Sequence, residues 1–223
     1  MLLQKCNLRL PDAVIFDWDS TLVDNWGAIH TALNVTLKQM GHETWTECET
    51  RQRANSSAKD AFPRLFAEHS DEALQIFYQA FERFHLDSLK VLEGSKDLIE
   101  WLFKNKVFLS IVSNKNGMHL RKEVSKLGWS NYFHSIVGAG DAVEDKPSPE
   151  PVKLALKNAG LGVKRKVWFV GDTVLDLQCA VLSNCLPILI GGQGVEKSDL
   201  DKWPPHGVFQ SCESLYQSCR NII

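Results

Sequence analysis

The chain has 223 residues, which is enough for one large hydrophobic core or for a core domain that carries a small insert. Its formal net charge is only −2, and its lysines and arginines are scattered, so we expect neither nucleic acid nor a membrane surface as a partner. No apolar stretch has the length of a membrane span, and the first ten residues lack the features of a signal peptide.

Short apolar runs of strand length alternate with helix patterns along most of the chain. The runs cover residues 13–16, 107–112, 136–137, 167–170 and 187–190. Because they are almost continuously apolar, they are typical of strands buried on both faces. One helix pattern begins after Ser95, and a second runs from Leu120 to Leu127. A third begins after Ser148, with Pro149 at its first helical position. This alternation predicts an α/β fold with a Rossmann-like, doubly wound parallel sheet.

Residues 24–89 interrupt the alternation. Apolar side chains recur at helical spacing from Ile29 to Met40 and again from Leu74 to Phe84, where a helix opens near Ser70. A polar stretch, residues 49–59, separates these two patterns. We therefore predict a core made of residues 1–23 and 90–223, with an α-helical domain, residues 24–89, inserted after the first strand. The final stretch from Gly191 is expected to be irregular up to a short helix after Ser211.

The chain contains six cysteines, and none forms a C-x-x-C pair or a zinc-binding spacing. We expect them to be reduced thiols that pack as small apolar side chains. Reduced thiols are typical of a reducing compartment, and the sequence therefore predicts a cytoplasmic protein.

Two carboxylates, Asp17 and Asp19, follow the first predicted strand. If the backbone stays extended, side chains two residues apart project from the same face. Two neighbouring acids are costly unless a cation or a shared proton compensates them. An Asp-x-Asp pair is common, however, and by itself it is also typical of a strand that simply ends in polar residues.

Three later segments strengthen a catalytic interpretation. Ser113 and Asn114 follow a second strand, Lys146 precedes a predicted helix, and Asp172 and Asp176 follow a third strand. In a parallel sheet, these strand ends converge on one edge. The sequence thus gathers four carboxylates, one lysine and one hydroxyl at a single place.

The ordered motifs are Asp-x-Asp-x-Thr at 17–21, Ser-Asn at 113–114, Lys-Pro-x-Pro at 146–149 and Gly-Asp-x-x-x-Asp at 171–176. Together they resemble the haloacid dehalogenase superfamily, and within it the phosphoglycolate-phosphatase-like subfamily with a helical cap. The resemblance runs from about Val14 to Ile190. It implies a Mg²⁺-dependent phosphatase that hydrolyses a small phosphorylated metabolite through an aspartyl-phosphate, with residues 24–89 as the cap.

The resemblance also implies catalytic roles that agree with the chemistry of the side chains. Asp17 is the expected nucleophile, and Asp19 is the expected general acid and base. Lys146 would offset the repulsion between the nucleophile and the substrate phosphate. Ser113, with the backbone amide of Asn114, would bind phosphate oxygens.

The magnesium ligands implied by the resemblance are the side chains of Asp17 and Asp172 and the backbone carbonyl of Asp19. Asp176 is either a further ligand or a residue that orients the site. The chain departs from the commonest family pattern at Ser20, where many relatives carry glycine. Activity is expected to survive this change because serine is small and forms turns readily.

Three basic residues of the predicted cap, Arg51, Arg53 and Lys59, are candidates for contact with an anionic substrate tail. A solvated surface loop is an equally good interpretation of each. Neither the physiological substrate nor the oligomeric state can be deduced from the sequence.

Several alternative functions are compatible with parts of this pattern. Dehalogenase chemistry is disfavoured because that branch lacks the second aspartate, Asp19. A sugar-phosphate mutase, or a phosphonate hydrolase that uses a cap lysine, remains possible within the same superfamily. Outside it, a receiver-like phosphoacceptor domain also phosphorylates an aspartate on a parallel sheet, but it has no helical cap. An inactive scaffold is the remaining alternative.

Overall fold

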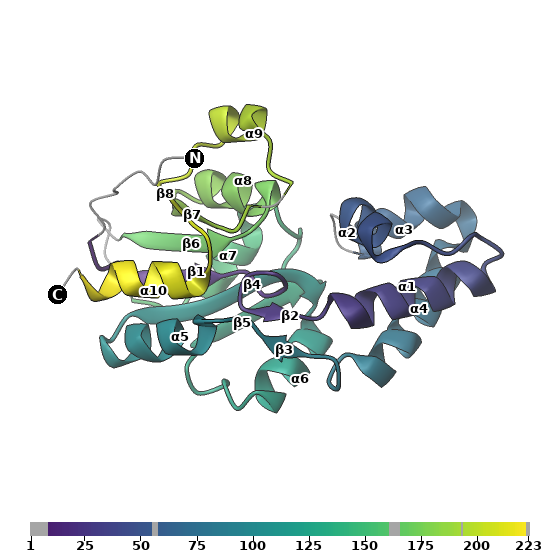
Figure 1. The fold of residues 1–223 in the computed structure, drawn as a ribbon, viewed down its shortest axis with the longest axis horizontal. Helices are drawn as coiled ribbons and strands as arrows, with labels where there is room; N and C mark the ends of the chain where they lie inside the picture. The colour runs from purple at the N-terminus through teal and green to yellow at the C-terminus, as the bar shows by residue number, and fades with distance from the viewer. Residues whose placement is uncertain (1–8, 55–57, 161–165, 193, 222–223) are drawn as a thin grey trace. The chain divides into compact units, whose positions relative to one another are not determined.

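The computed structural model describes residues 9–54, 58–160, 166–192 and 194–221. The chain divides into two compact units: Met1–Val23 together with Val91–Ile223, and Asp24–Lys90. The first unit contains a parallel sheet, and the second is helical (Figure 1). The two segments that connect the units pair with each other as a two-stranded sheet, β2 (Val23–Asp24) with β3 (Lys90–Val91).

The main sheet has six strands in the order β5-β4-β1-β6-β7-β8, and each neighbouring pair is parallel. In chain order the strands are β1 (Ala13–Phe16), β4 (Phe108–Asn116), β5 (Ser135–Ala139), β6 (Val167–Gly171), β7 (Leu186–Ile190) and β8 (Gly207–Phe209). Strand β1 is the central strand, and Ala13 is in register with Phe108 on one side and with Val167 on the other. The chain reverses its direction of winding at β1, so the predicted doubly wound α/β fold is confirmed.

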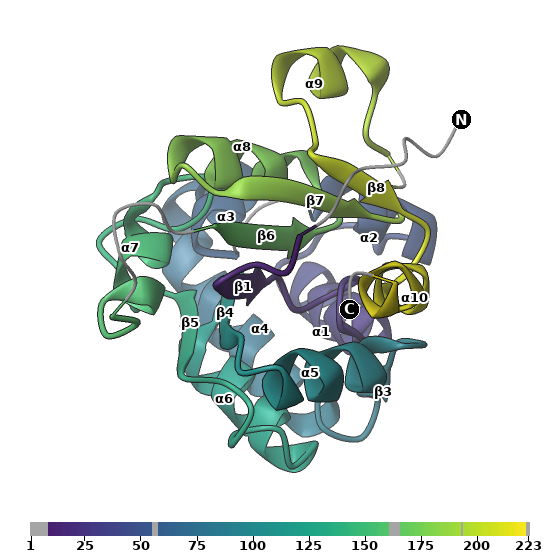
Figure 2. The ribbon, with the colours of Figure 1, turned by 90° about the vertical axis from the view of Figure 1, so that its left-hand side faces the viewer.

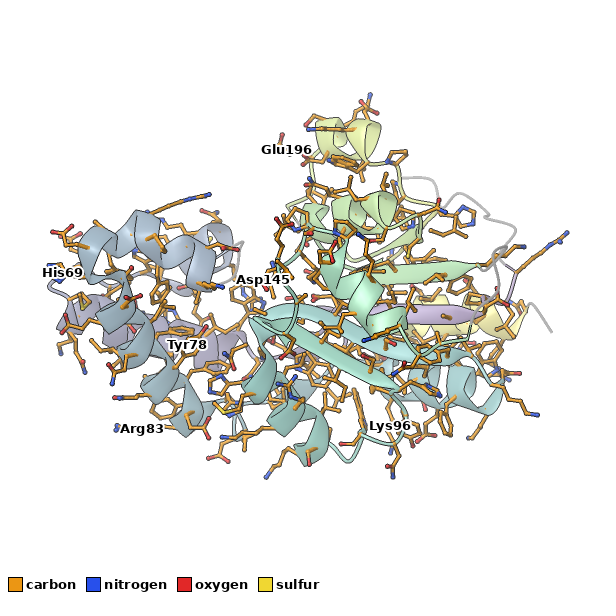
Figure 3. All side chains as sticks on the ribbon, turned by 180° about the vertical axis from the view of Figure 1, so that it is seen from behind. His69, Tyr78, Arg83, Lys96, Asp145 and Glu196 are labelled. Carbon is orange, nitrogen blue, oxygen red and sulfur yellow. The ribbon has the colours of Figure 1, made fainter. Side chains whose placement is uncertain are left out.

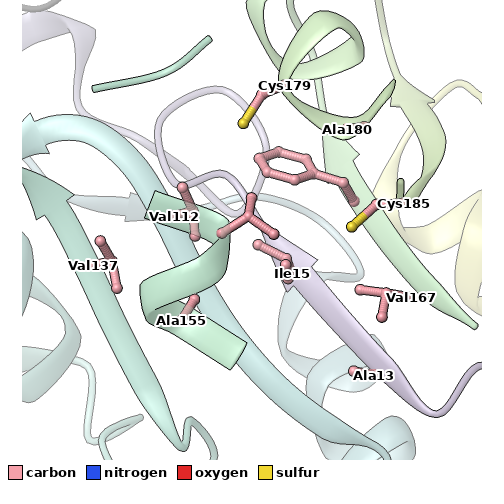
Figure 4. Close-up of a cluster of buried hydrophobic side chains, with 11 residues drawn as sticks. Ala13, Ile15, Val112, Val137, Ala155, Val167, Cys179, Ala180 and Cys185 are labelled. Carbon is pink, nitrogen blue, oxygen red and sulfur yellow. The ribbon is translucent and has the colours of Figure 1, made fainter. Parts of the chain in front are cut away.

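Helices cover both faces of this sheet (Figure 2). One face packs against α7 (Glu150–Leu156) and α8 (Val174–Leu182), and the other against α5 (Ser95–Lys104), α6 (Gly117–Lys126) and α10 (Cys212–Arg220). On the α7 and α8 side, Ile15 packs with Ala155, Phe169 and Cys179 in a buried cluster (Figure 4). Burial on both faces explains why β1 and β6 read as continuous apolar runs.

Strand β4 carries an irregularity near its carboxyl end. Val112 pairs with Val137, but the next pair is Asn116 with Ala139, so β4 contains two more residues than β5 between these pairs. Bulges of this kind re-aim side chains. The bulge packs closely on Gly138, where a Cβ atom would collide with the backbone of Lys115 and Gly117.

The second unit consists of four α-helices and a short 3₁₀ helix among the described residues of Asp24–Lys90. They are α1 (Trp26–Gln39), α2 (Glu47–Arg53), α3 (Ala58–Phe66), η1 (Ala67–His69) and α4 (Ser70–Phe84). Phe62, Phe77 and Phe81 pack with Leu33 and Leu37 in its core. Tyr78 and Arg83 mark α4 in Figure 3. The predicted helices with apolar faces from Ile29 and from Leu74 are both present.

Several local predictions differ from the structure. In the polar stretch 49–59, residues 49–53 belong to α2 instead of a loop, because Thr46 and Glu49 make a capping box at the start of this helix. Residues 58 and 59 begin α3, and residues 55–57 lie outside the described residues. Helix α7 begins at Glu150, so Pro149 precedes the helix, and α5 begins at Ser95 itself after Gly94. Among the elements that were not predicted are α9 (Lys197–Lys202) and β8. Both are too short to produce a clear hydrophobic period.

Among the described residues, no helix combines the length and the apolar character that crossing a membrane requires.

Candidate active site

The loop after β1 presents the first two carboxylates. The amide of Asp17 donates to the carbonyl of Val170, so the first carboxylate still follows the ladder between β1 and β6. After Trp18 the chain turns: Ser20 adopts a φ of 64°, and its amide donates to the carbonyl of Val23. Asp19 lies at the start of this turn, and its backbone forms an isolated bridge with Val23. Asp17 is buried, whereas the Asp19 side chain keeps 18% of its exposure.

Lys146 lies between two carboxylates. Its Nζ is 2.6 Å from Oδ1 of Asp17 and 2.7 Å from Oδ1 of Asp176. Burial by itself would lower the pKa of Lys146, but the two carboxylates outweigh burial, and the pKa is raised overall. The lysine is therefore a cation that lies against Asp17, the expected nucleophile.

Asn114 fixes the position of this lysine. Its Oδ1 accepts from the amide of Lys146 at 3.0 Å, and its Nδ2 donates to the carbonyl of the same residue at 3.0 Å. The loop before Lys146 is tied down by Asp145, which is labelled in Figure 3 and accepts from the amide of Gly140. The Asn114 side chain thus holds the lysine loop, while its backbone amide lies in the β4 bulge next to Ser113. Ser113 is buried, and its Oγ accepts from the amide of Lys115.

Asp172 follows β6 and joins the same cluster. Its Oδ1 accepts a hydrogen bond from Thr21 at 3.0 Å, so the threonine of the first motif orients a carboxylate of the last one. One side-chain oxygen from each of Asp17, Asp172 and Asp176 lies within 4.8 Å of the others. This distance confirms the part of the sequence prediction that concerns the ends of β1 and β6, which bring Asp17, Asp172 and Asp176 together.

The electrostatics of this cluster fit a divalent cation. Burial raises the pKa of Asp172, and Asp17 and Asp176 raise it further. Burial also raises the pKa of Asp17, although Lys146 lowers it. Three carboxylates and one lysine leave two uncompensated negative charges, and hard carboxylate oxygens are the ligands that Mg²⁺ prefers. A cation with two positive charges would neutralise the cluster.

Asp176 has contacts at both of its oxygens. Oδ1 faces Lys146, and Oδ2 accepts from the amide of Thr173 at 3.0 Å and from its hydroxyl at 2.6 Å, which caps α8. Gly171 makes room for this carboxylate, because a Cβ atom there would collide with the Asp176 side chain. Gly171 is the last residue of β6, and its lack of a side chain serves this close packing.

A second buried charge network surrounds Asp19 and was not predicted. Lys115 Nζ lies 2.9 Å from Oδ1 of Asp19 and 2.7 Å from Oε2 of Glu123. The same Glu123 oxygen accepts from Nε1 of Trp18 at 2.6 Å. Burial raises the pKa of Asp19 to about 6, against the lowering effect of Lys115.

Two features of the sequence were available to indicate this network. Lys115 directly follows the Ser-Asn motif, and Glu123 interrupts the buried face of α6. Trp18 is fully buried against Trp129, and its indole also has a polar partner in Glu123.

The three basic candidates of the helical unit lie on α2 and α3. Arg51 lies over the Trp26 ring and 3.9 Å from Asp24, while Arg53 lies over the Trp45 ring and pairs with Glu49 at 3.1 Å. Lys59 is exposed on α3. Whether any of them contacts a substrate stays a prediction.

Comparison with known proteins places this geometry in context. The model of the haloacid dehalogenase-like hydrolase family matches residues 14–190. A curated relative, phosphoglycolate phosphatase 1 of Pseudomonas aeruginosa, is 28% identical over 182 residues, which are 77% of this chain and 66% of that protein. The phosphoglycolate phosphatase of Photorhabdus laumondii is 26% identical over 78% of this chain and 77% of that protein. The first of these matches spans just under two thirds of the relative's length.

Solved structures also resemble this chain. A HAD-superfamily hydrolase from Ehrlichia chaffeensis is 30% identical, with a TM-score of 0.66 over 97% of this chain and all of that chain. A haloacid dehalogenase-like hydrolase from Bacteroides fragilis has a TM-score of 0.84 over 92% of this chain and 99% of its own, at 18% identity. The second likeness establishes the fold alone.

Proposed function

This chain belongs to the haloacid dehalogenase-like hydrolase family, and on that premise we propose that it is a magnesium-dependent phosphatase that forms an aspartyl-phosphate at Asp17. The observation that carries the proposal is the contact of Lys146 with Asp17 inside a cluster of three buried carboxylates. A buried lysine beside an anionic nucleophile suits a substrate that is itself a dianion.

The residues that would hold Mg²⁺ are Asp17 and Asp172 through their side chains and Asp19 through its backbone carbonyl. When bound, the ion supplies charge neutralisation for a phosphate oxygen and for the carboxylates. Asp176 is better explained as an orienting residue than as a ligand, because one of its oxygens is engaged by Lys146 and the other by Thr173.

The first proposed step is attack by a carboxylate oxygen of Asp17 on phosphorus. The new Asp17 oxygen–phosphorus bond forms as the bond to the ester oxygen breaks, and that oxygen takes a proton from the Asp19 carboxyl. Lys146 keeps its position beside Asp17 because Asn114 holds its backbone from both sides. The charge that spreads over the phosphoryl oxygens is met by the Ser113 hydroxyl and the Asn114 amide.

The second proposed step is hydrolysis of the aspartyl-phosphate. A water molecule gives a proton to the Asp19 carboxylate, and the water oxygen bonds to phosphorus. The bond between the Asp17 oxygen and phosphorus breaks at the same time. Phosphate leaves and both aspartates return to their starting forms, so the step needs no further reactant. Asp19 therefore alternates between acid and base, a role that its raised pKa of about 6 favours.

Phosphoglycolate is the first substrate to test, because curated relatives that match most of this chain carry the name phosphoglycolate phosphatase. Arg51, Arg53 and Lys59 stay candidates for contact with the carboxylate of such a substrate. A sugar-phosphate mutase would isomerise a sugar phosphate without releasing phosphate. A phosphonate hydrolase would form a Schiff base between a cap lysine and an aldehyde substrate, and borohydride would trap that adduct. Either result would replace the phosphatase proposal.

The test is a phosphate-release assay over a panel of phosphorylated metabolites, including phosphoglycolate, with and without Mg²⁺. We expect turnover that a chelator abolishes and that Mg²⁺ restores. The variant Asp17→Asn should keep its circular dichroism spectrum and lose turnover. Activity equal to the wild type in that variant would exclude the proposed mechanism.

A further inference from the structure

Lys115 follows the two phosphate-binding candidates directly in the sequence, but its amine is committed elsewhere. Its side chain is only 5% exposed, and its Nζ lies 2.7 Å from Glu123 and 2.9 Å from Asp19. Glu123 is fully buried on α6, and its Oε2 also accepts from the indole of Trp18. The four side chains form a chain of contacts from α6 to the loop that carries Asp19, which we call the Asp19 anchor.

In the Asp19 anchor, each contact fixes the position of the next side chain. Glu123 belongs to a regular helix, so its carboxylate fixes the Lys115 amine from a rigid element. The amine in turn fixes Oδ1 of Asp19, whose own loop is set by the turn at Ser20. Trp18 holds the same Glu123 oxygen from the other side. Burying three charged groups together is unfavourable unless their geometry is good, so this arrangement needs a reason beyond stability.

We propose that Lys115 is a positioning residue that holds the Asp19 carboxylate in the orientation for proton transfer, with Glu123 and Trp18 fixing the lysine. This inference rests on the proposed phosphatase function. It assigns Lys115 no contact with phosphate and no part in bond making. A misplacement of about 1 Å costs a catalytic group roughly 10²-fold in rate, so loss of the anchor should act on kcat.

The step most sensitive to the anchor is the second one, in which Asp19 takes a proton from water. The substrate p-nitrophenyl phosphate isolates it, because nitrophenolate is a good leaving group and needs little proton donation. With a misplaced Asp19, the first step should still release nitrophenol, and hydrolysis of the aspartyl-phosphate should become slow. Lys115 as a phosphate ligand would instead weaken substrate binding and slow the first step.

The decisive variant is Lys115→Met combined with Glu123→Gln, which removes the lysine together with its fully buried partner and so avoids leaving Glu123 as an unpaired buried charge. Lys115→Met alone should lower the urea unfolding midpoint, and we expect the midpoint of the double variant to lie close to that of the wild type. Its kcat for p-nitrophenyl phosphate should be about 10²-fold lower, with KM within about threefold. Rapid mixing should show a burst of about one nitrophenol per enzyme before the slow steady state.

Other results would overturn the inference. If the double variant had both the kcat and the unfolding midpoint of the wild type, Lys115 would serve only to compensate the negative charge of Glu123. A raised KM without a burst would make Lys115 a phosphate ligand. If the double variant does not fold, Lys115→Arg is the second test, because arginine keeps the charge but cannot place a nitrogen at the position of Nζ. This variant should have a kcat about tenfold lower at constant KM. A wild-type kcat would contradict the inference. Absence of Mg²⁺-dependent nitrophenol release by the wild type would instead refute the proposed function.

Discussion

The Nζ atom of Lys146 lies 2.6 Å from Oδ1 of Asp17, which places a buried cation against the proposed nucleophile. The contact joins two segments that are far apart in the sequence, because Lys146 belongs to the loop before α7 and Asp17 follows β1. Asn114, from β4, holds that loop in place. The lysine thus stabilises the carboxylate cluster. The proposed function gives it a second role, the binding of phosphate, and the two roles can be tested together.

Replacement of Lys146 by methionine should abolish phosphatase activity and destabilise the protein by about 3 kcal/mol, because Asp17 and Asp176 would lose their cation in a buried site. Urea unfolding measures the second effect. Adding Asp176→Asn to the variant should recover part of the stability and none of the activity. A Lys146→Met protein as stable as the wild type would contradict this account of the cluster.

Gly171→Ala should lower both activity and stability although it adds a single methyl group. The new Cβ would meet the Asp176 carboxylate, which must then move away from Lys146. Such overpacking costs about 1–3 kcal/mol. Gly27→Ala is the matched control, because a Cβ there meets nothing within 4 Å. Thermal unfolding and kcat are the measurements, and equal behaviour of the two variants would argue against close packing at Gly171.

Ser20 adopts a left-handed conformation, with a φ of 64°, that costs an ordinary residue about 1 kcal/mol. We therefore expect Ser20→Gly to be more stable than Ser20→Ala by about that amount, since both lack the hydroxyl and only glycine relieves the strain. Chemical denaturation of the two variants checks this. A more stable alanine variant would show that the turn at Ser20 is not strained.

Buried cysteines should make stability fall at alkaline pH. Burial raises the pKa of Cys212 to about 11 and that of Cys219 to about 12, above the value near 8.5 of an unfolded chain. The folded state then retains protons that the unfolded state loses. This contribution is complete below about pH 8.5 and disappears as pH rises through the folded values.

The unfolding free energy of the wild type should consequently fall more steeply between pH 8 and pH 10 than that of Cys219→Ala. Alkylation offers an independent check, because iodoacetamide at pH 8 should modify the exposed Cys48 well before the buried Cys179, Cys212 and Cys219. Equal labelling of all four thiols in the native protein would contradict this prediction.

The sequence predicted those parts of the molecule that depend on periodicity and on motif order. The buried strands β1 and β6 read as apolar runs because helices cover both of their faces. The meeting of Asp17, Asp172 and Asp176 followed from the parallel arrangement of the strand ends. Helix α2 was missed because its helical tendency comes from a capping box instead of an apolar face.

The contacts around Asp19 could not be predicted in the same way. Lys115 and Glu123 are eight residues apart on a strand and a helix, and only the β4 bulge and the start of α6 bring them together. The role of Asn114 is similar, since its side chain reaches a loop that lies 32 residues further along the chain. Such contacts depend on the tertiary structure, so a local feature such as the glutamate on the buried face of α6 marks a residue but does not identify its partner.

The central claim is that Asp17 carries the phosphoryl group, and chemical trapping tests it most directly. Wild-type protein is mixed with Mg²⁺ and p-nitrophenyl phosphate, quenched in acid, and treated with borohydride, which reduces an acyl phosphate to the alcohol. Peptide mass spectrometry should then find homoserine at position 17, only when both Mg²⁺ and substrate were present. Continued phosphate release without any modification of Asp17, or modification of another carboxylate instead, would contradict the account.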